Sequence, residues 1–434
     1  MNFVAVFFLL VQFLSVSRGF IQNLQYKSTD AFVDASIDAY GLADGGLIDV
    51  KYNISTQNTV DDPSTSFLLL LVVDQDQYDS WYAGRTNRIN YGSETYFQDV
   101  QELCNMPSMF RKRMYPSEGS FQHHVEGTDL YDVLILQCFP QQTPLFAHLT
   151  LELLNPTSEG CCFGHLPIES VMDINIALVE TILYSIMLIS YISSILTSEK
   201  EAVKSMHYIL LVTVIISVLS SLLDYVGKSL QNDNGKLAQG VETTVYIFHF
   251  LETLSFKFTV LLLGMGWDFV RQNIAPQEKT VVAFIFGFFF VIGISQVPCL
   301  GVDADDLSSG CQALDLIAYV LAGLMLLGTI IALNYSVSQL RAIISNLSWY
   351  PSMPVLYARL KQYNSFRNLF LALLVVPTVM YMVEITVLTW KQKWIGNLGQ
   401  SVVKMVFICY TGAIFLPLDT SLLNRPFNGS LNSN

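Results

Sequence analysis

Seven apolar stretches follow one another after Met172, and they constrain the fold of this 434-residue chain more than any other feature. Most of them are close to 20 residues, the length that an α-helix needs to cross a hydrocarbon core about 30 Å thick. They lie at Ile174–Leu196, Met206–Val226, Thr243–Met265, Thr280–Leu300, Leu314–Leu333, Asn368–Leu388 and Val402–Leu418. The sequence therefore predicts a multi-pass membrane protein with a seven-helix bundle at residues 173–418 and a short cytosolic tail at 419–434.

The composition agrees with a membrane protein and locates the charge of the chain. Hydrophobic residues make up 52% and charged residues 14% of the sequence, whereas a typical soluble domain has about 25% charged residues. A soluble enzyme, a disordered chain and a fibrous protein are therefore excluded. Between Phe20 and Met172 there are 7 Lys/Arg and 20 Asp/Glu, which accounts for the formal charge of −13. So acidic a domain repels nucleic acid, and nucleic-acid binding is excluded.

The residues before the bundle predict a signal peptide and a secreted β-domain. The apolar run Phe3–Leu14 is followed by small residues at 17 and 19, which favours cleavage before Phe20, so that residues 1–19 are removed. In the remainder, at 20–172, Ser66–Val73 is continuously apolar and Leu145–Leu154 partly alternates. Short β-type runs separated by turn-forming residues are typical of a β-sandwich.

The charges of the loops predict the orientation of the bundle. A secreted N-terminus and seven spans place the N-terminus in the lumen or outside the cell and the C-terminus in the cytosol. The predicted cytosolic segments hold nine Lys/Arg and the exterior loops four, as the positive-inside rule requires. The longest cytosolic loop, Asn334 to Arg367, has four basic residues and no acidic one, namely Arg341, Arg359, Lys361 and Arg367. These four residues are a candidate coupling surface, although the positive-inside rule alone also explains them.

Cysteines and one sequon predict covalent features of the exterior parts. Cys104 and Cys138 are expected to form a disulfide within the β-domain, and Cys299 and Cys311 a second one across the loop between the fourth and fifth spans. The state of the adjacent pair Cys161-Cys162 stays open. Asn53 heads the sequon Asn-Ile-Ser and is the predicted glycosylation site.

No pattern in the sequence supports catalysis. There is no zinc-type spacing of Cys and His, no HExxH motif and no GxSxG motif. Only two of the six histidines, His207 and His249, lie in or near the membrane, too few for an intramembrane metallohydrolase. We therefore expect a protein that is not an enzyme and has no cofactor.

Polar residues in the outer halves of the spans predict a pocket. They are Glu180, Asp224, His249, Glu252, Glu384 and Lys404. A charge in lipid is costly, so such residues normally face the bundle interior or a wet cavity. The five other than Asp224 are expected to converge and to hold a polar or amphipathic ligand or a lipid headgroup. The alternative is two separate structural contacts, His249 with Glu252 and Glu384 with Lys404.

Three short motifs resemble a known family. They are Leu153-Leu154-Asn155-Pro156 with Glu159-Gly160, Met206-His207, and Met265-Gly266-Trp267 followed by Val270-Arg271. In this order and context they are similar to the intimal thickness-related receptor family, whose membrane part is called a rhodopsin-like GPCR transmembrane domain. That family belongs to a wider group in which a GOLD-like β-sandwich precedes seven helices.

The resemblance implies receptor-type signalling, in which the exterior domain binds a ligand or partner and the helices act on a cytosolic transducer. The third span ends without the acidic-Arg-aromatic triplet and the seventh lacks Asn-Pro-x-x-Tyr, so the resemblance does not extend to G-protein coupling. A second hypothesis is a sorting factor or cargo chaperone of the secretory pathway. A third, a transporter or channel, rests only on the polar residues. Plasma-membrane localisation favours a receptor, and Golgi localisation favours sorting.

Overall fold

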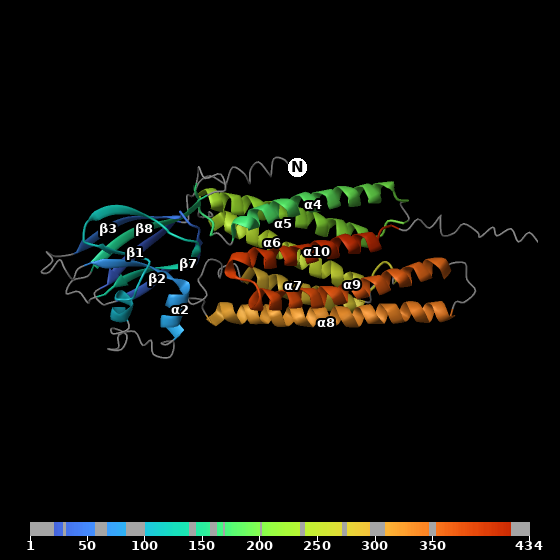
Figure 1. Cartoon of the computed structure of the whole chain (residues 1–434). Helices are drawn as coiled ribbons and strands as arrows, with labels where there is room; N and C mark the ends of the chain where they lie inside the picture. Colours follow the sequence, from blue (N-terminus) through green and yellow to red (C-terminus); the bar gives the residue numbers. More distant parts are fainter. Residues whose placement is uncertain are drawn as a thin grey trace, which may run out of the picture. The chain divides into compact units, whose positions relative to one another are not determined.

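The computed structural model describes residues 21–28, 32–56, 67–83, 100–138, 145–156, 163–167, 170–199, 202–234, 239–270, 276–295, 309–346 and 353–417. The signal peptide, Cys161, Cys162, Cys299, Arg271 and the tail at 419–434 lie outside these residues. The chain divides into two compact units, one of strands and one of helices (Figure 1). The first unit contains the residues up to Met172 together with 228–238 and 390–394, and the second contains the rest.

The first unit is a two-sheet β-structure, as the sequence predicts. One sheet has the order β1-β8-β3-β6, with β9 also paired to β8, and the other has the order β2-β7-β4-β5. The strands are β1 Ile21–Ser28, β2 Phe32–Leu42, β3 Leu47–Thr56, β4 Leu68–Asp74, β5 Phe110–Met114, β6 Glu118–His124, β7 Asp129–Gln137, β8 Leu145–Pro156 and β9 Phe163–Gly164. Every pairing within the two sheets is antiparallel.

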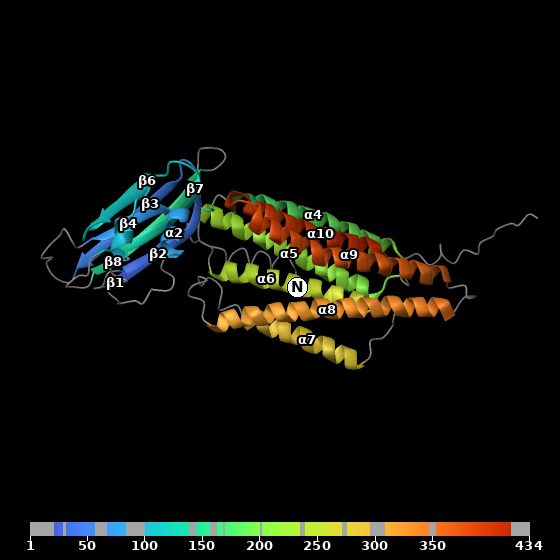
Figure 2. The same cartoon turned by 60° about the horizontal axis from the view of Figure 1, so that its bottom comes forward.

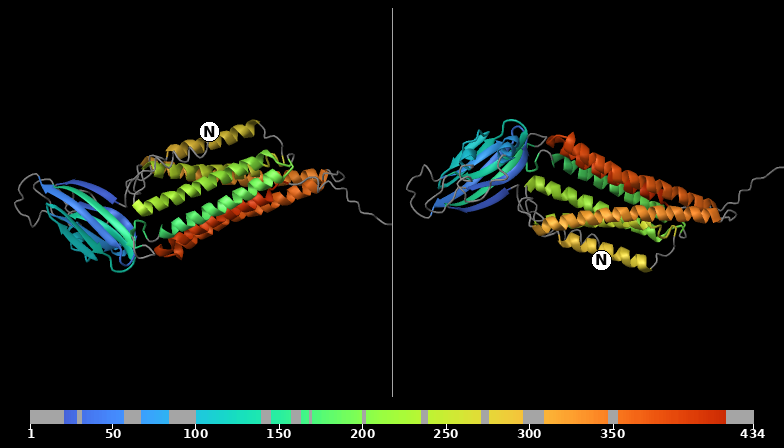
Figure 3. Two further views of the ribbon diagram at one scale, coloured as in Figure 1. Left: turned by 90° about the horizontal axis from the view of Figure 1, so that it is seen from above. Right: turned by 90° about the horizontal axis from the view of Figure 1, so that it is seen from below.

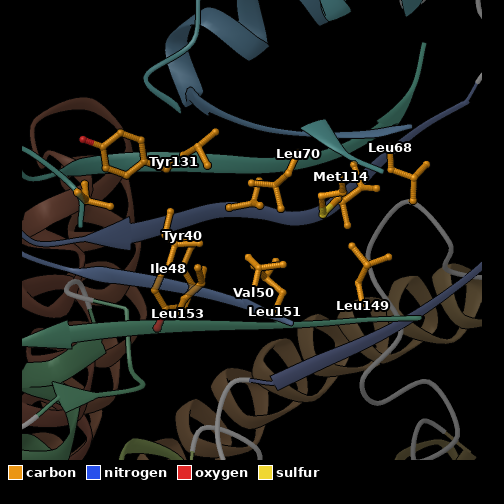
Figure 4. Packing of buried hydrophobic residues seen from close by; sticks show 14 of the residues in the cluster. Tyr40, Ile48, Val50, Leu68, Leu70, Met114, Tyr131, Leu149, Leu151 and Leu153 are labelled. Atoms are coloured by element: carbon orange, nitrogen blue, oxygen red, sulfur yellow. The ribbon is translucent and has the colours of Figure 1, made fainter. Parts of the chain in front are cut away.

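The core of this unit lies between the two sheets (Figure 4). Strand β8 shows how the sequence builds it. Its residues Ala147, Leu149, Leu151 and Leu153 are buried there, whereas His148, between Ala147 and Leu149, is exposed. Side chains alternate between the two faces of a strand, so a period-2 apolar pattern gives a strand with one buried face. Asn53 is exposed on β3, at the position of the predicted glycosylation site.

Strand β4 is buried on both faces, which explains why its sequence is apolar without alternation. Leu68, Leu70 and Val72 enter the core between the sheets. The alternate residues Leu69, Leu71 and Val73 pack in a second cluster with Leu103, Cys104, Leu136 and Cys138, against which Tyr78 and Trp81 of helix α2 (Gln75–Ala83) also pack. The predicted disulfide is present in this cluster: Cys104 is joined to Cys138, with the two Cα atoms 6.1 Å apart. Cys311 is also disulfide-bonded.

The described residues of the second unit form seven long helices. They are α4 Val171–Thr197, α5 Ser205–Asn234, α6 Gln239–Gly264, α7 Pro276–Ser295, α8 Ser309–Asn346, α9 Met353–Thr386 and α10 Lys393–Ile414. Within the described residues, five of them, α4 to α8, are long and apolar enough to cross a membrane. We call the end of the bundle at which α4 begins the outer end, and the end at which α4 stops the inner end.

Two helices extend well beyond their predicted spans, and this changes the predicted coupling loop. Helix α8 continues to Asn346 and α9 begins at Met353, so most of the segment from Asn334 to Arg367 is helical. The prediction of a loop there is wrong because an apolar run marks the part of a helix in lipid, whereas the polar continuation is still helical. Arg341 lies on α8, and Arg359, Lys361 and Arg367 lie on α9.

The bundle has one main core and one peripheral helix. Buried residues of α4, α5, α6, α8, α9 and α10 meet in a single cluster, in which Tyr363, Phe366, Phe370 and Phe415 have no exposed surface. Hydroxyl groups connect two of these helices, since Oγ1 of Thr213 lies 2.9 Å from Oγ of Ser255 and 2.8 Å from Oγ1 of Thr259. Helix α7 lies at the edge of the bundle beside α6 and α8 (Figures 2 and 3). Helix α9 contains one internal proline, Pro377.

Candidate functional site

The first candidate site is a group of charged side chains in the outer half of the bundle. Nζ of Lys404 on α10 lies 2.7 Å from Oε1 of Glu252 on α6, whose side chain is only 5% exposed. The carboxyl of Glu180 on α4 is hydrogen-bonded to Ser401, one turn before Lys404 on α10. Asp224 on α5 is close enough to interact electrostatically with Glu180. Three helices thus meet through an ion pair and a hydrogen bond, and a fourth contributes a nearby carboxylate.

One of the predicted pocket residues, His249, is placed differently from the predicted convergence. Nδ1 of His249 lies 3.7 Å from Oε2 of Glu252, but 70% of the His249 side chain is exposed. His249 therefore points to the perimeter of the bundle, and the predicted convergence is wrong for this residue. The pair of Lys404 with Glu252 agrees with the predicted convergence, whereas the alternative would have paired Lys404 with Glu384. Glu384 lies on α9, and its side chain is outside the described part of the structure.

A cavity of about 450 Å³ lies on the side of α6 that His249 faces. Its lining residues come from α6, α7 and α8, and they are Tyr246, His249, Phe250, Thr253, Leu254, Lys257, Phe289, Ile292, Gly293, Ala318 and Ala322. This volume falls within the range of about 300–1,000 Å³ typical of small-molecule pockets. The polar residues of α6 therefore belong to two separate sites: Glu252 forms an ion pair inside the bundle, and His249 and Lys257 line a cavity at its edge.

A third group of residues, which no sequence pattern predicted, joins the inner ends of four helices. Its centre is Phe269, just after α6. The ring of Phe269 stacks on Phe415 with centroids 5.0 Å apart and is perpendicular to the ring of His207 at a centroid distance of 5.4 Å. The guanidinium of Arg359 lies over the Phe269 ring, 4.7 Å from its centroid. Next to it, Oδ2 of Asp268 accepts a hydrogen bond of 2.5 Å from the backbone N–H of Ser205. We call Ser205, His207, Asp268, Phe269, Arg359 and Phe415 the inner-end cluster.

The family-like motif Met265-Gly266-Trp267 gives the end of α6 its shape. The N–H of Gly266 donates to the carbonyl of Leu263, and the N–H of Trp267 donates to that of Leu262. This is a Schellman C-cap, which requires a left-handed residue at the position of Gly266, where φ is +73°. A second residue of positive φ, Asp268 at +62°, turns its carboxylate toward the first turn of α5, where free backbone N–H groups favour a negative charge.

In the β-unit, the buried side chain of Asn155, from the Leu153–Pro156 motif, forms hydrogen bonds with the backbone of three other residues. Its side-chain amide donates to the carbonyls of Gly41 and Leu166, both at 2.9 Å, and its Oδ1 accepts from the N–H of Ala43 at 2.7 Å. The side chain is thereby satisfied and fixes the segment after β8 against the loop after β2. Among the described residues, no group of three or more His, Cys, Asp or Glu is placed to hold a metal ion.

Comparison with known families identifies the helical unit. Residues 172–422 match the family model described as GOST, seven transmembrane domain, which covers more than half of the chain. The chain belongs to the GOST seven-transmembrane family. It is accordingly an integral multi-pass membrane protein, and the resemblance to seven-helix proteins with a preceding β-domain is confirmed at this level. A search of curated proteins finds no match.

The GOST match places the candidate sites with respect to the family domain. The outer ion pair, the cavity and the inner-end cluster all lie within residues 172–422, whereas Asn155 lies before them. The four basic residues of the predicted coupling surface have different environments in this domain. Arg341 and Lys361 are exposed, while Arg359 is half-buried over Phe269 and donates to Oε1 of Gln362 at 3.0 Å. Arg359 is therefore part of the packing between helices.

Replacing Asn155 tests its role in the β-unit. We expect Asn155→Leu to destabilise this unit by about 2–4 kcal/mol, because the substitution removes three hydrogen bonds. It leaves the buried carbonyls of residues 41 and 166 and the half-buried N–H of residue 43 unsatisfied. Asn155→Asp keeps the acceptor for Ala43 but loses both donors, so its effect is expected to fall in the same direction. Limited proteolysis of the full-length protein, followed at peptides of the β-unit, measures the change. An unchanged cleavage rate for both variants would contradict this role.

The buried His165 predicts a pH dependence of the same unit. Burial lowers the pKa of His165, and the nearby carboxylates of Glu152 and Asp233 only partly oppose this effect. The unfolded chain, with a histidine pKa near 6.5, therefore binds the proton more tightly than the folded one. The contribution of neutral His165 to the stability of the β-unit is fully present above about pH 6.5. It is lost as the pH falls toward the pKa of His165 in the folded state, which is the lower of the two.

We expect the β-unit of the full-length protein to become more sensitive to protease between about pH 6.5 and 5, with a smaller increase in His165→Gln. The pKa of His123 is also lowered by burial, so the comparison includes His123→Gln and the double variant. A pH profile that is the same in wild type and the double variant would refute the assignment to these two histidines.

Proposed function

We propose that this GOST protein is a receptor-type membrane protein, in which the β-unit binds a ligand or partner on the luminal or extracellular side and the helices respond at their inner ends. The observation that supports the proposal is the inner-end cluster. It joins α5, α6, α9 and α10 through ring and cation–π contacts of Phe269, the common neighbour, and through the hydrogen bond from Ser205 to Asp268. Such contacts can break and re-form together as the helices pass between two arrangements. A bound partner that favours one arrangement would raise its population at the expense of the other.

The energies of these contacts suit such a role. The ring contacts of Phe269 are each worth about 0.5–1.5 kcal/mol, and the hydrogen bond from Ser205 to the Asp268 carboxylate about 1.5–3 kcal/mol. Typical coupling energies between two sites are about 1–3 kcal/mol. The free energy lost with one or two of these contacts is therefore comparable to the free energy by which a bound partner favours one arrangement of the helices. The exposed basic residues Arg341 and Lys361 would then be the part of the surface that a cytosolic transducer reads.

Two sets of variants test the receptor function in cells without knowledge of the ligand. Phe269→Ala removes the centre of the inner-end cluster and is expected to change basal second-messenger levels. Arg341→Ala combined with Lys361→Ala leaves the cluster intact and is expected to reduce any such change. Phe258→Ala, an aromatic residue of α6 that packs on Phe286 of α7, is the matched control. If no second messenger responds to any of these variants at equal surface expression, the receptor function is wrong.

A second candidate function is a sorting factor or cargo chaperone of the secretory pathway, and a different observation favours it. Tyr363, Phe366 and Phe415 fill the inner part of the bundle with side chains that have no exposed surface. Binding of a transducer between these helices would have to displace them. A fixed bundle that only carries the β-unit needs no such movement. Imaging of tagged protein distinguishes the two functions, because a steady Golgi signal supports sorting and a plasma-membrane signal supports the receptor.

A further inference from the structure

The cavity between α6, α7 and α8 contains a lysine in apolar surroundings. Lys257 is half-buried on α6, seven residues before the helix ends at Gly264, which corresponds to about 10 Å along the helix. Its Nζ lies 5.1 Å from the centre of the Phe289 ring on α7. Among the described residues, no carboxylate pairs with it. A charged lysine at such a depth normally has an anionic partner or a wet cavity, and the π-face of Phe289 compensates for only part of the missing charge.

The shape of the cavity comes from small residues at two of its walls. Gly293 on α7 has no side chain, and the ring of Phe250 occupies the place where one would be: a Cβ on Gly293 would lie 2.1 Å from the Phe250 ring. On α8 the wall is formed by Ala318 and Ala322, which are one helical turn apart. Toward the outer end, the hydroxyl of Tyr246 donates to the carbonyl of Gly293 at 3.5 Å and links α6 to α7.

The lining is apolar along most of its length and positively charged at one point. Between Tyr246 and Lys257 the cavity follows α6 for 11 residues, or about 16 Å. A volume of about 450 Å³ has room for roughly 15 groups of the size of a water molecule or a methylene, at about 30 Å³ each. That is about the volume of one acyl chain. Such a chain fits the apolar lining, and an anionic head fits Lys257.

We propose that this cavity binds a single-chain anionic lipid, with its carboxylate or phosphate on the ammonium of Lys257 and its acyl chain along Phe250, Leu254 and Ile292 toward Tyr246. The site is distinct from the Glu252–Lys404 pair, which lies on the interior side of α6. It also does not depend on the receptor or sorting function, because its binding is measured on the purified protein.

The test uses full-length protein in nanodiscs of neutral phosphatidylcholine and a photoreactive C16 fatty acid with a diazirine near the end of its chain. We expect labelling of peptides that contain residues 246–257 or 318–322. The corresponding C16 alcohol, with the same chain and no charge, is expected to label at least roughly tenfold less, since a charge-assisted contact is worth a factor of about ten or more. Competition with single-chain lysophosphatidate and with unlabelled palmitate shows whether phosphate or carboxylate is preferred.

Two pairs of variants separate binding from folding. Lys257→Gln is expected to reduce labelling by roughly tenfold or more, whereas Lys257→Arg keeps it within about threefold. Ala322→Leu fills the cavity and is expected to abolish labelling. Gly323→Leu adds a side chain at the next residue, where an added Cβ meets no atom within 4 Å, and is expected to label like wild type. Thermal unfolding in the nanodiscs identifies any variant that fails to fold.

The proposal is overturned if the alcohol labels as well as the acid, if Lys257→Gln labels like wild type, or if Ala322→Leu and Gly323→Leu behave alike. It is also overturned if neither lysophosphatidate nor palmitate competes. Should Lys257→Gln fail to fold, the comparison of acid with alcohol on the wild type and the Ala322→Leu and Gly323→Leu pair decide the outcome.

Discussion

Full-length protein with Cys104→Ala and Cys138→Ala is expected to lose about 4 kcal/mol of stability in its β-unit. The disulfide closes a loop of 34 residues, for which the chain-entropy estimate is about 4 kcal/mol and the usual range about 2–5 kcal/mol. The effect should be near the full estimate because both cysteines are buried in the cluster on the outer face of the β2-β7-β4-β5 sheet. Without the bond, the segment that carries Leu103 can leave the sheet and expose Leu69 and Leu71.

Hydrogen exchange of the full-length protein, followed at peptides of β4 and β7, measures this loss. Cys409→Ala is the control, because Cys409 is an exposed free cysteine on α10 and its replacement should leave exchange in the β-unit unchanged. Mapping of the native protein without reduction should also recover the 104–138 linkage. Recovery of both cysteines as free thiols, or normal exchange in the double variant, would show that the bond does not hold the cluster together.

The second large effect concerns the ion pair in the membrane. Lys404→Met is expected to lower the stability of the bundle by about 3–5 kcal/mol, because it leaves the carboxylate of Glu252, 5% exposed, without its cation in a medium of low dielectric constant. Glu252→Gln is expected to cost less, since the Lys404 side chain is 27% exposed and its long stem can move its charge outward.

The combined variant Glu252→Gln with Lys404→Met removes both charges and is expected to recover most of the loss, since replacing both members of a buried ion pair is often neutral. Thermal unfolding in nanodiscs supplies the four corners of the double-mutant cycle. Lys361→Met, which replaces an exposed lysine of α9, is the control for the loss of a positive charge as such. A combined variant that is less stable than Lys404→Met alone would argue against a direct pair.

Residue patterns predicted most of the secondary structure, and the exceptions have a physical reason. The alternation in β8 and the continuous apolar run of β4 both correspond to what their faces contact, one buried face in the first case and two in the second. The apolar runs located all seven helices. They could not give the ends of α8 and α9, because hydropathy reports contact with lipid and a helix does not stop where lipid does.

The site residues were harder to predict, because depth along a helix can be read from a sequence but direction around it cannot. His249 and Glu252 lie about 60° apart on α6, at about 100° per residue, so one can face the interior while the other faces the perimeter. Lys404 could equally have met Glu384 or Glu252, since all three were expected at similar depth. The inner-end cluster was missed because its members come from four helices. Its one local signal was the glycine C-cap beside Asp268.

Pro377 gives α9 a mechanical property that the other long helices do not share. Proline donates no backbone hydrogen bond, so the carbonyl of Leu373 loses its partner and the helix has a soft point there. On the inner side of this point, Phe366 and Phe370 anchor α9 in the core. Beyond it, Val379, Met382 and Val383 are exposed. Met380 of this outer arm packs against Gly399 of α10. Pro377 is therefore the point at which any bend of α9 is expected, between an inner arm packed in the core and an outer arm with more exposed side chains. Helix α8 has 38 residues and no proline. It would therefore tilt as one rigid element over its whole length of about 57 Å.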